Sequence, residues 1–403
     1  MTGALTAELT AIAREHGAVG FGVAGVEPFE RERLSLLSHR QSGFSGPLRL
    51  TYDEPDLATD VTKSFPWARH LVVVAWGYLS STASPARRGP LVGRFATADQ
   101  YEGVRRITSE LASRLHRNGH RAEVLIDDNR LLDRAAAVRS GVGWPGKSTM
   151  TLVPGQGPWV LLGSVVTDAP LTISQPMSRS CGTCIACIPA CPTNALTEAG
   201  LDARRCLSTW LQTPGSIPHW IRPLLGRRIY GCDDCLSVCP PGQRAVAGAG
   251  GKSGSLPFGE LLTLSDDALL DRFHWWYVPR RDGRYLRRNL LVAAGNSVEP
   301  DAKEPIERHM GHPSSMIRSH AAWALGRSLG AGSVPTLRAA LESEAASETR
   351  EEISSALLMV ERPATHHHWR RSPRPTTPGG GPIRSRSMRP WTTCLNAIHG
   401  LRT

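Results

Sequence analysis

The sequence lacks the long apolar runs that membrane proteins need. Its longest candidate, LVVVAWGYL at residues 71–79, is well short of the roughly 18 residues that cross a bilayer as a helix. The N-terminus also lacks a basic segment followed by a hydrophobic stretch, which is the pattern of a secretory signal. We therefore expect a cytoplasmic protein with no membrane contact.

Lysine and acidic residues are absent from residues 362–403, which carry eight arginines and so account for most of the net charge of +11. The rest of the chain is nearly balanced in charge. The composition of this segment, with stretches such as RSPRPTTPGGGPIRSRS, predicts a disordered basic tail. The tail either binds RNA weakly or is a dispensable extension. A Gly- and Ser-rich stretch at 245–255 predicts a hinge or surface loop.

Apolar patterns divide the remainder of the chain into three parts. Residues 1–175 alternate amphipathic helices with apolar runs of strand length, such as HLVVVAWGYL at 70–79, which predicts an α/β (α+β) domain. Residues 176–245 contain clustered cysteines between short elements. Residues 256–361 carry apolar residues at three- and four-residue spacing and resemble HEAT-type helical repeats. We therefore expect three folded domains with these boundaries.

Nine cysteines in a cytoplasmic chain indicate metal binding or catalysis rather than disulfides. Eight of them lie between Cys181 and Cys239, where CGTCIACIPACP follows the C-x2-C-x2-C-x3-C-P pattern that bacterial ferredoxins use for [4Fe–4S] clusters. In that pattern the fourth cysteine ligates the other cluster of the pair. The sequence therefore predicts a ferredoxin-like domain with two [4Fe–4S] clusters.

The same exchange divides the eight cysteines into two ligand sets. The first cysteine set comprises Cys181, Cys184, Cys187 and Cys239. The second cysteine set comprises Cys191, Cys206, Cys232 and Cys235. Zinc, which also binds Cys-x-x-Cys pairs, is the alternative metal. Two neighbouring clusters form a path for electrons, so we expect a redox-active group at its end.

The order of several motifs resembles the epoxyqueuosine reductase family over roughly residues 5 to 360. They are GVGWPGKSTM, GSVVTD, CGTCIACIPACPTNAL and RRIYGCDDCLSVCP, followed by the HEAT-like helices. The resemblance implies a reductase that uses cobalamin and two [4Fe–4S] clusters to remove the epoxide oxygen of epoxyqueuosine in tRNA. It also implies a low-potential external electron donor.

By the same resemblance, Asp127 in the segment IDDNR is the proton donor that the loss of the oxygen requires. Asp128 is the neighbouring competitor, but alternation along the strand sends it to the opposite face. The alternative for Asp127 is a cap on the helix that begins near Leu131. The resemblance also implies cobalamin contacts, which are Trp144, Gly146, Lys147, Ser148, Asp233 and Asp234. For the last two, a turn in the cluster loop is the alternative.

Several positions depart from the family's pattern. Thr62 stands where the family has an arginine, Gln100 and Glu102 replace an aspartate and a histidine, and Arg130 replaces a proline. These changes affect the pocket and leave the cysteine scaffold intact. They favour, as an alternative function, a corrinoid reductase acting on a small molecule. A ferredoxin-like electron-transfer module is a further alternative.

The segment WWYVPRRDGRYLRRNLL at 275–291 interleaves aromatic residues with arginines. Guanidinium groups pair with phosphates and aromatic rings stack on unpaired bases, so the segment predicts a contact with tRNA. The alternative is a domain junction in which the aromatic rings are buried. We expect the protein to be a monomer.

Overall fold

The computed structural model describes residues 2–48, 50–79, 89–247 and 256–361. The basic tail at 362–403 and most of the expected hinge lie outside the described residues. Within them, no helix is long and apolar enough to cross a membrane.

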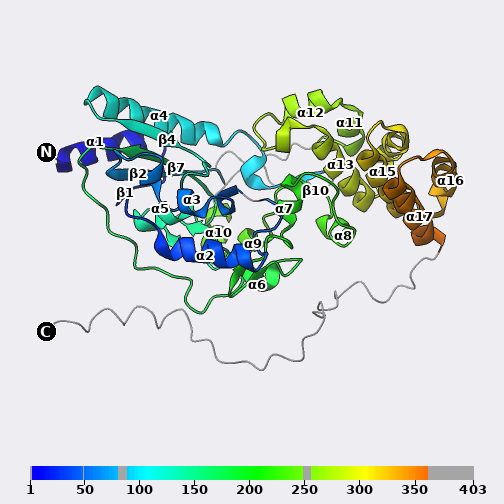
Figure 1. The fold of residues 1–403 in the computed structure, drawn as a ribbon, viewed down its shortest axis with the longest axis horizontal. Helices are drawn as coiled ribbons and strands as arrows, with labels where there is room; N and C mark the ends of the chain where they lie inside the picture. Colours follow the sequence, from blue (N-terminus) through cyan, green and yellow to red (C-terminus); the bar gives the residue numbers. More distant parts are fainter. Residues whose placement is uncertain (1, 49, 80–88, 248–255, 362–403) are drawn as a thin grey trace. The chain divides into compact units, whose positions relative to one another are not determined.

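A four-stranded antiparallel sheet forms the centre of the N-terminal part (Figure 1). Its spatial order is β1 (Gly20–Gly25), β2 (His70–Gly77), β7 (Val160–Thr167) and β4 (Ala122–Leu125). β2 pairs with β7 in register from His70↔Thr167 to Gly77↔Val160. The strands expected from the sequence are present, and the α/β class is confirmed.

Both faces of this sheet are covered, which explains why the central strand is apolar without alternation. Side chains of successive strand residues point to opposite faces. In β2, Val72 and Val74 join the core beneath α1 (Thr2–Glu15) and α4 (Tyr101–Arg117), while Leu71 and Val73 join the core on the other face with α5 (Asp133–Arg139). Every residue from Leu71 to Ala75 is consequently buried.

Short elements connect these layers. The N-terminal part also contains α2 (Glu30–Gln41), α3 (Pro55–Ala58), β3 (Leu91–Val92), β5 (Trp144–Pro145) and β6 (Thr151–Leu152). One-turn 3-10 helices lie at Leu50–Tyr52, Val61–Lys63 and Arg94–Ala96. β5 and β6 form a small antiparallel hairpin. This hairpin carries the GWPGKST turn toward the cysteines.

The cysteine segment consists of short elements. These are α6 (Cys187–Ala190), β8 (Leu196–Thr197), β9 (Gly200–Leu201), α7 (Leu207–Gln212), α8 (Arg222–Leu225), β10 (Arg228–Tyr230), α9 (Asp234–Ser237) and α10 (Pro240–Ala247). β10 pairs in parallel with β3, which lies between β2 and α4 in the chain. This pairing ties the second cysteine set to the N-terminal part.

The C-terminal part is helical. Its helices are α11 (Phe258–Thr263), α12 (Asp266–Arg272), α13 (Arg284–Ser297), α14 (Lys303–Arg308), α15 (Ser315–Leu329), α16 (Val334–Ser343) and α17 (Ser347–Glu361), with 3-10 turns at Pro279–Arg281, Pro300–Ala302, His309–Gly311 and Gly330–Ser333. One hydrophobic core continues from Leu207 through Ile221 and Tyr230 to Leu357. This core crosses the boundary that we expected between the cysteine segment and the repeats.

Candidate active site

The eight clustered cysteines are free thiols in the structure, and they interact in two groups. In the first group, burial raises the pKa of Cys187, and the charges of Cys181, Cys184 and Cys239 add to that effect. In the second group, burial raises the pKa of Cys235, and the charges of Cys232, Cys206 and Cys191 add to it in the same way. These groups have the composition of the two expected cysteine sets.

The donor set fits iron–sulfur clusters. Burial raises the pKa of Cys232 and that of Cys235 to about 12, so a thiolate there needs the positive charge of bound iron. Among the described residues, no three His, Cys, Asp or Glu side chains come close enough to hold a single metal ion. A cube of four irons spaces its thiolates more widely than one tetrahedral ion does.

Hydrogen-bond donors surround the sulfur atoms of both sets. The Lys147 backbone N–H donates to Cys181 Sγ at 3.4 Å, and the Ala195 N–H donates to Cys191 Sγ at 3.2 Å. Arg228 bonds both the Cys232 side chain and Asp234. Such bonds stabilise thiolate charge and tune the potential of a cluster. The sequence analysis did not single out Arg228, and its place in RRIYGCDDC was the available signal.

Asp127 lies just past the end of β4, in a turn. Its backbone is left-handed, with φ of 51°, and its side chain is exposed. A residue other than glycine in this conformation is uncommon, although aspartate tolerates it better than most. The hydroxyl of Tyr101, the first residue of α4, donates to Asp127 Oδ2 at 3.3 Å. The structure therefore brings the expected proton donor together with a tyrosine from a different element.

Asp128 is engaged elsewhere. It accepts hydrogen bonds from the backbone and the guanidinium of Arg130, at 2.7 to 3.0 Å. Arg130, which replaces the family's proline, therefore closes a local turn around the competitor. Helix α5 has Leu132 at its N-cap without a side-chain cap, so Asp127 does not cap this helix.

Two further groups lie near the Asp127 carboxyl. Burial and the Asp127 charge raise the pKa of Asp133 well above its ordinary value, and Asp133 Oδ1 is buried with no partner among the described residues. Burial raises the pKa of Tyr230 as well, and Asp127 adds to that effect. Tyr230 lies two residues before Cys232. The site at the sheet end and the second cysteine set are thus neighbours.

Of the residues expected to contact cobalamin, those in the GWPGKST turn lie beside the first cysteine set. Trp144 packs with Cys181 and Cys239, and the ammonium of Lys147 donates to the Gly182 carbonyl at 2.9 Å. Ser148 is buried in the same turn. At Gly146, an added Cβ would lie 2.9 Å from the Met150 carbonyl oxygen, so the turn itself favours glycine there.

The two aspartates of GCDDC have separate partners. Asp233 accepts a hydrogen bond from the Arg94 backbone N–H at 2.6 Å, and burial raises the pKa of Asp233 to about 6. Asp234 pairs with Arg228 at 2.6 Å. Both side chains therefore support the cluster loop, and their roles toward cobalamin stay predictions.

The aromatic and basic segment at 275–291 is buried in part: Tyr277, Arg280, Arg281 and Arg284 are exposed, whereas other members of the segment lie in the core. Arg287 and Arg288 are buried, and Arg288 donates to the carbonyls of Thr213 and Trp210. Trp276 is also buried and donates to the Ala96 carbonyl at 2.7 Å. The alternative of a domain junction is right for these buried residues. Burying a guanidinium requires several acceptors, which backbone carbonyls of the core supply to both arginines.

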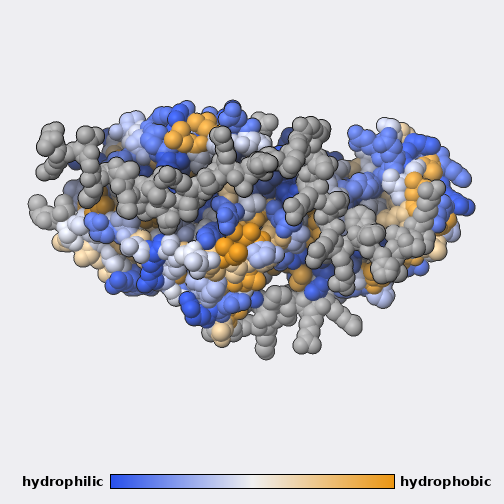
Figure 2. Space-filling view, turned by 90° about the horizontal axis from the view of Figure 1, so that it is seen from below, coloured by the Kyte–Doolittle hydropathy of each residue, from blue (hydrophilic) through white to orange (hydrophobic). Residues whose placement is uncertain are grey.

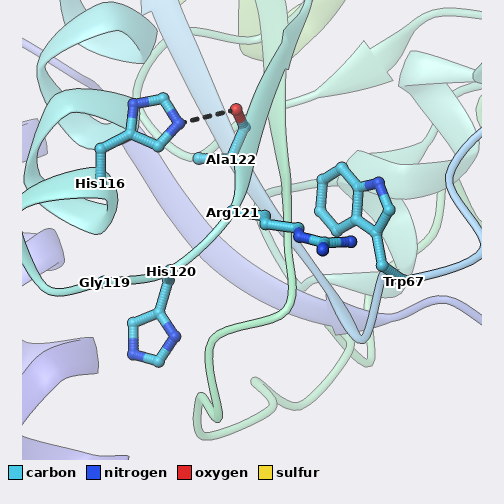
Figure 3. A pocket seen from close by; sticks show the side chains of 6 residues that line it. All are labelled: Trp67, His116, Gly119, His120, Arg121 and Ala122. Atoms are coloured by element: carbon cyan, nitrogen blue, oxygen red, sulfur yellow. Dashed lines mark hydrogen bonds between the residues drawn. The ribbon is translucent and has the colours of Figure 1, made fainter.

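A hollow of about 560 Å³ lies at the other end of the sheet (Figure 3). It is lined by Trp67, His116, Gly119, His120, Arg121 and Ala122. Ala122 begins β4, whereas Asp127 follows the end of that strand. The hollow contains none of the expected site residues and is separate from the site built around Asp127.

Comparisons with known proteins agree with this arrangement. Residues 180–242 match the 4Fe-4S double cluster binding domain, and residues 280–357 match HEAT repeats. The protein therefore carries two [4Fe–4S] clusters. A crystal structure of epoxyqueuosine reductase with an epoxyqueuosine-modified tRNA-Tyr stem loop superposes with a TM-score of 0.78 at 27% identity, covering 89% of this chain and 99% of the other.

Two further relatives span most of the chain. A Bacillus subtilis epoxyqueuosine reductase, in a structure with its catalytic aspartate loop swung out of the active site, superposes with a TM-score of 0.76 at 26% identity and covers 89% of this chain and 99% of its own. The epoxyqueuosine reductase of Pseudomonas aeruginosa is 31% identical over 339 residues, which are 78% of this chain and 92% of the relative. The chain belongs to the epoxyqueuosine reductase family and is an oxidoreductase.

Proposed function

We propose that this protein reduces epoxyqueuosine to queuosine in tRNA, using cobalamin and its two [4Fe–4S] clusters. The observation that carries the proposal is the position of Asp127, which lies beside Tyr101 and Tyr230. Tyr230 is two residues before Cys232 of the second cysteine set. A proton donor and an electron path thus meet at one end of the sheet. A tRNA substrate supports a cytoplasmic location for this activity.

The residues beside Asp127 fit cobalamin. Asp133 Oδ1 is a buried acceptor without a partner among the described residues, and the amide side chains of a corrin are hydrogen-bond donors that would satisfy it. Ser148 and the GWPGKST turn lie next to the first cysteine set and would complete the contact. Cobalamin, when bound, supplies low-potential cobalt chemistry at the epoxide.

The overall reaction consumes two electrons and two protons, and it releases the epoxide oxygen as water. Asp127 supplies a proton to this oxygen as the C–O bond breaks. The Tyr101 hydroxyl bonds Oδ2 of Asp127 and so orients the carboxyl, which leaves Oδ1 to hold the proton. In the structure of the Bacillus subtilis relative, a catalytic loop with an aspartate is swung out of the active site, which supports a corresponding role for the Asp127 turn.

Anaerobic reconstitution with cobalamin tests the proposal. The loaded protein is expected to contain about eight irons, to show the cobalt EPR signal of bound cobalamin, and to form queuosine from epoxyqueuosine-modified tRNA. The Asp127→Asn variant should bind the same iron and cobalamin and lose turnover. Turnover by this variant at the wild-type rate would remove Asp127 from the mechanism.

The pocket substitutions favour one second candidate. Gln100 is buried at the N-cap of α4, immediately before Tyr101, so the departures from the family's pattern lie beside the proton donor. Clusters and cobalamin without queuosine formation, together with turnover of a free epoxide, would indicate a small-molecule reductase instead.

A further inference from the structure

The two cysteine sets differ in their exposure to solvent. Cys184 is exposed, and its neighbour Ile185 keeps 48% of its surface accessible. In the second cysteine set every residue is partly covered and none is exposed. The loop before α6 is therefore the edge at which the first set meets solvent, whereas the second set adjoins Tyr230 and the Asp127 site.

Three cations lie around this edge. Lys147 bonds the loop through Cys181 Sγ and the Gly182 carbonyl. Arg179 places its guanidinium 5.4 Å from the ring centre of Trp144, which itself packs on Cys181. Arg244 acts electrostatically on Cys239. Among the described residues, none of the three cations forms an ion pair with an acid.

Acidic residues are missing from the same stretch of chain. Between Asp168 and Glu198 the sequence has no aspartate or glutamate and one charged residue, Arg179. In Figure 2 the molecule is viewed from the side on which α2 and α6 lie lowest in Figure 1, and this face shows apolar surface bordered by hydrophilic surface. An exposed apolar centre with unpaired cations around it is complementary to an acidic protein surface.

We propose that this edge, formed by Cys184, Ile185, Arg179 and Arg244, is the docking surface for a small acidic one-electron carrier of the ferredoxin class. Each docked carrier is oxidised by one electron and reduces one cluster by one electron. Two such transfers supply the two electrons consumed per epoxide oxygen. The proposal rests on the proposed function only in requiring that the clusters carry electrons toward the Asp127 site.

Cluster reduction can be measured directly by anaerobic stopped-flow absorbance with the cluster-loaded protein and a reduced plant-type ferredoxin. Steered association falls with ionic strength and is enhanced by 10-fold or more over neutral encounter. We expect the second-order rate constant to fall as salt rises, and to fall about 10-fold in Arg244→Glu and in Arg179→Glu at low salt. The Arg244→Gln variant should lie between Arg244→Glu and the wild type.

Arg69 offers a matched control, since it is exposed, forms no ion pair among the described residues, and precedes β2 at the end of the sheet away from Asp127. The Arg69→Glu variant should react with ferredoxin like the wild type. Reduced methyl viologen, a small cation, should reduce all variants at least as fast as the wild type. This comparison separates lost docking from damaged clusters.

A rate independent of salt, or equal rates in the Arg244→Glu and Arg69→Glu variants, would overturn the docking proposal. Queuosine formation driven by methyl viologen tests the proposed function separately. If viologen drives no queuosine formation while ferredoxin reduction still depends on Arg244 and Arg179, the substrate proposal fails and the docking surface stands.

Discussion

The hydrogen bond from Tyr101 to Asp127 gives the most direct test of how the proton donor is held. Replacing Tyr101 by phenylalanine removes the hydroxyl that lies 3.3 Å from Asp127 Oδ2 and keeps the ring in the first turn of α4. Asp127 then retains its position in the chain but loses the partner that orients its carboxyl. A left-handed turn with no other bond to this side chain among the described residues has little else to fix it.

The size of the effect follows from the geometry. The Asp127 carboxyl becomes charged as its proton leaves in the transition state. A hydrogen bond to a charged group contributes about 1.5 to 3 kcal/mol, and a 3.3 Å bond at an exposed carboxyl belongs at the lower end of that range. A loss of about 1.4 kcal/mol in the transition state corresponds to a tenfold fall in rate. Removing the acid itself in Asp127→Asn should cost about 10²-fold to 10⁴-fold.

Single-turnover queuosine formation at saturating modified tRNA and cobalamin measures this rate without the electron donor or product release. Ser354→Ala is the control, because it removes a hydroxyl whose hydrogen bond, to the Arg350 carbonyl, stays within α17. We expect Ser354→Ala to match the wild type and Tyr101→Phe to be about tenfold slower. If Tyr101→Phe reacts at the wild-type rate, Tyr101 does not orient the proton donor.

Three further predictions concern stability and potential. Arg228→Gln removes a cation bonded to the Cys232 side chain, so it should lower the reduction potential of one cluster and leave the other unchanged in an EPR redox titration. Arg318 donates two hydrogen bonds of 2.6 and 2.7 Å to buried Glu344 and lowers the pKa of Glu344 to about 2. Arg318→Leu should therefore destabilise α15 to α17 by about 2 to 3 kcal/mol, measured by hydrogen exchange. Equal protection of these helices in the variant and the wild type would contradict this prediction. Burial lowers the pKa of His309 from 6.5 to about 4, so the unfolded chain binds a proton at a higher pH than the folded protein does. The local stability of α13 and α14 should therefore fall by up to about 3 kcal/mol as the pH drops from 6.5 toward 4. Hydrogen exchange should show a smaller pH dependence in His309→Asn than in the wild type.

Much of the fold could be predicted from the sequence because its signals are local. The apolar run at 70–79 contains β2, as its length and composition predict. The cysteine spacing likewise predicted two groups of thiols, which the structure brings together. Periodicity and spacing are properties of short stretches of sequence, so they can be interpreted without knowledge of the tertiary structure.

The parts that depend on distant contacts could not be predicted in this way. Arg287 and Arg288 have the sequence appearance of an exposed basic stripe, yet carbonyls from Leu262 and Thr213 satisfy them inside the core. The unpartnered oxygen of Asp133 and the hydrogen bond of Tyr101 likewise depend on how loops meet in three dimensions. Residue type alone does not distinguish a buried, satisfied charge from a solvated one.

The shared core between the cysteine segment and the helical repeats limits how this protein can change over evolution. Ile217, Ile221 and Leu225 pack in the same cluster as Leu291 and Ala321, and Arg222 pairs with Glu352 of α17. A chain that lost the repeats, or received them from an unrelated protein, would expose this apolar surface directly beside the thiols of the second cluster. We therefore expect substitutions on this face of the repeats to be constrained by the second cysteine set as well, since Cys232 packs against the same core.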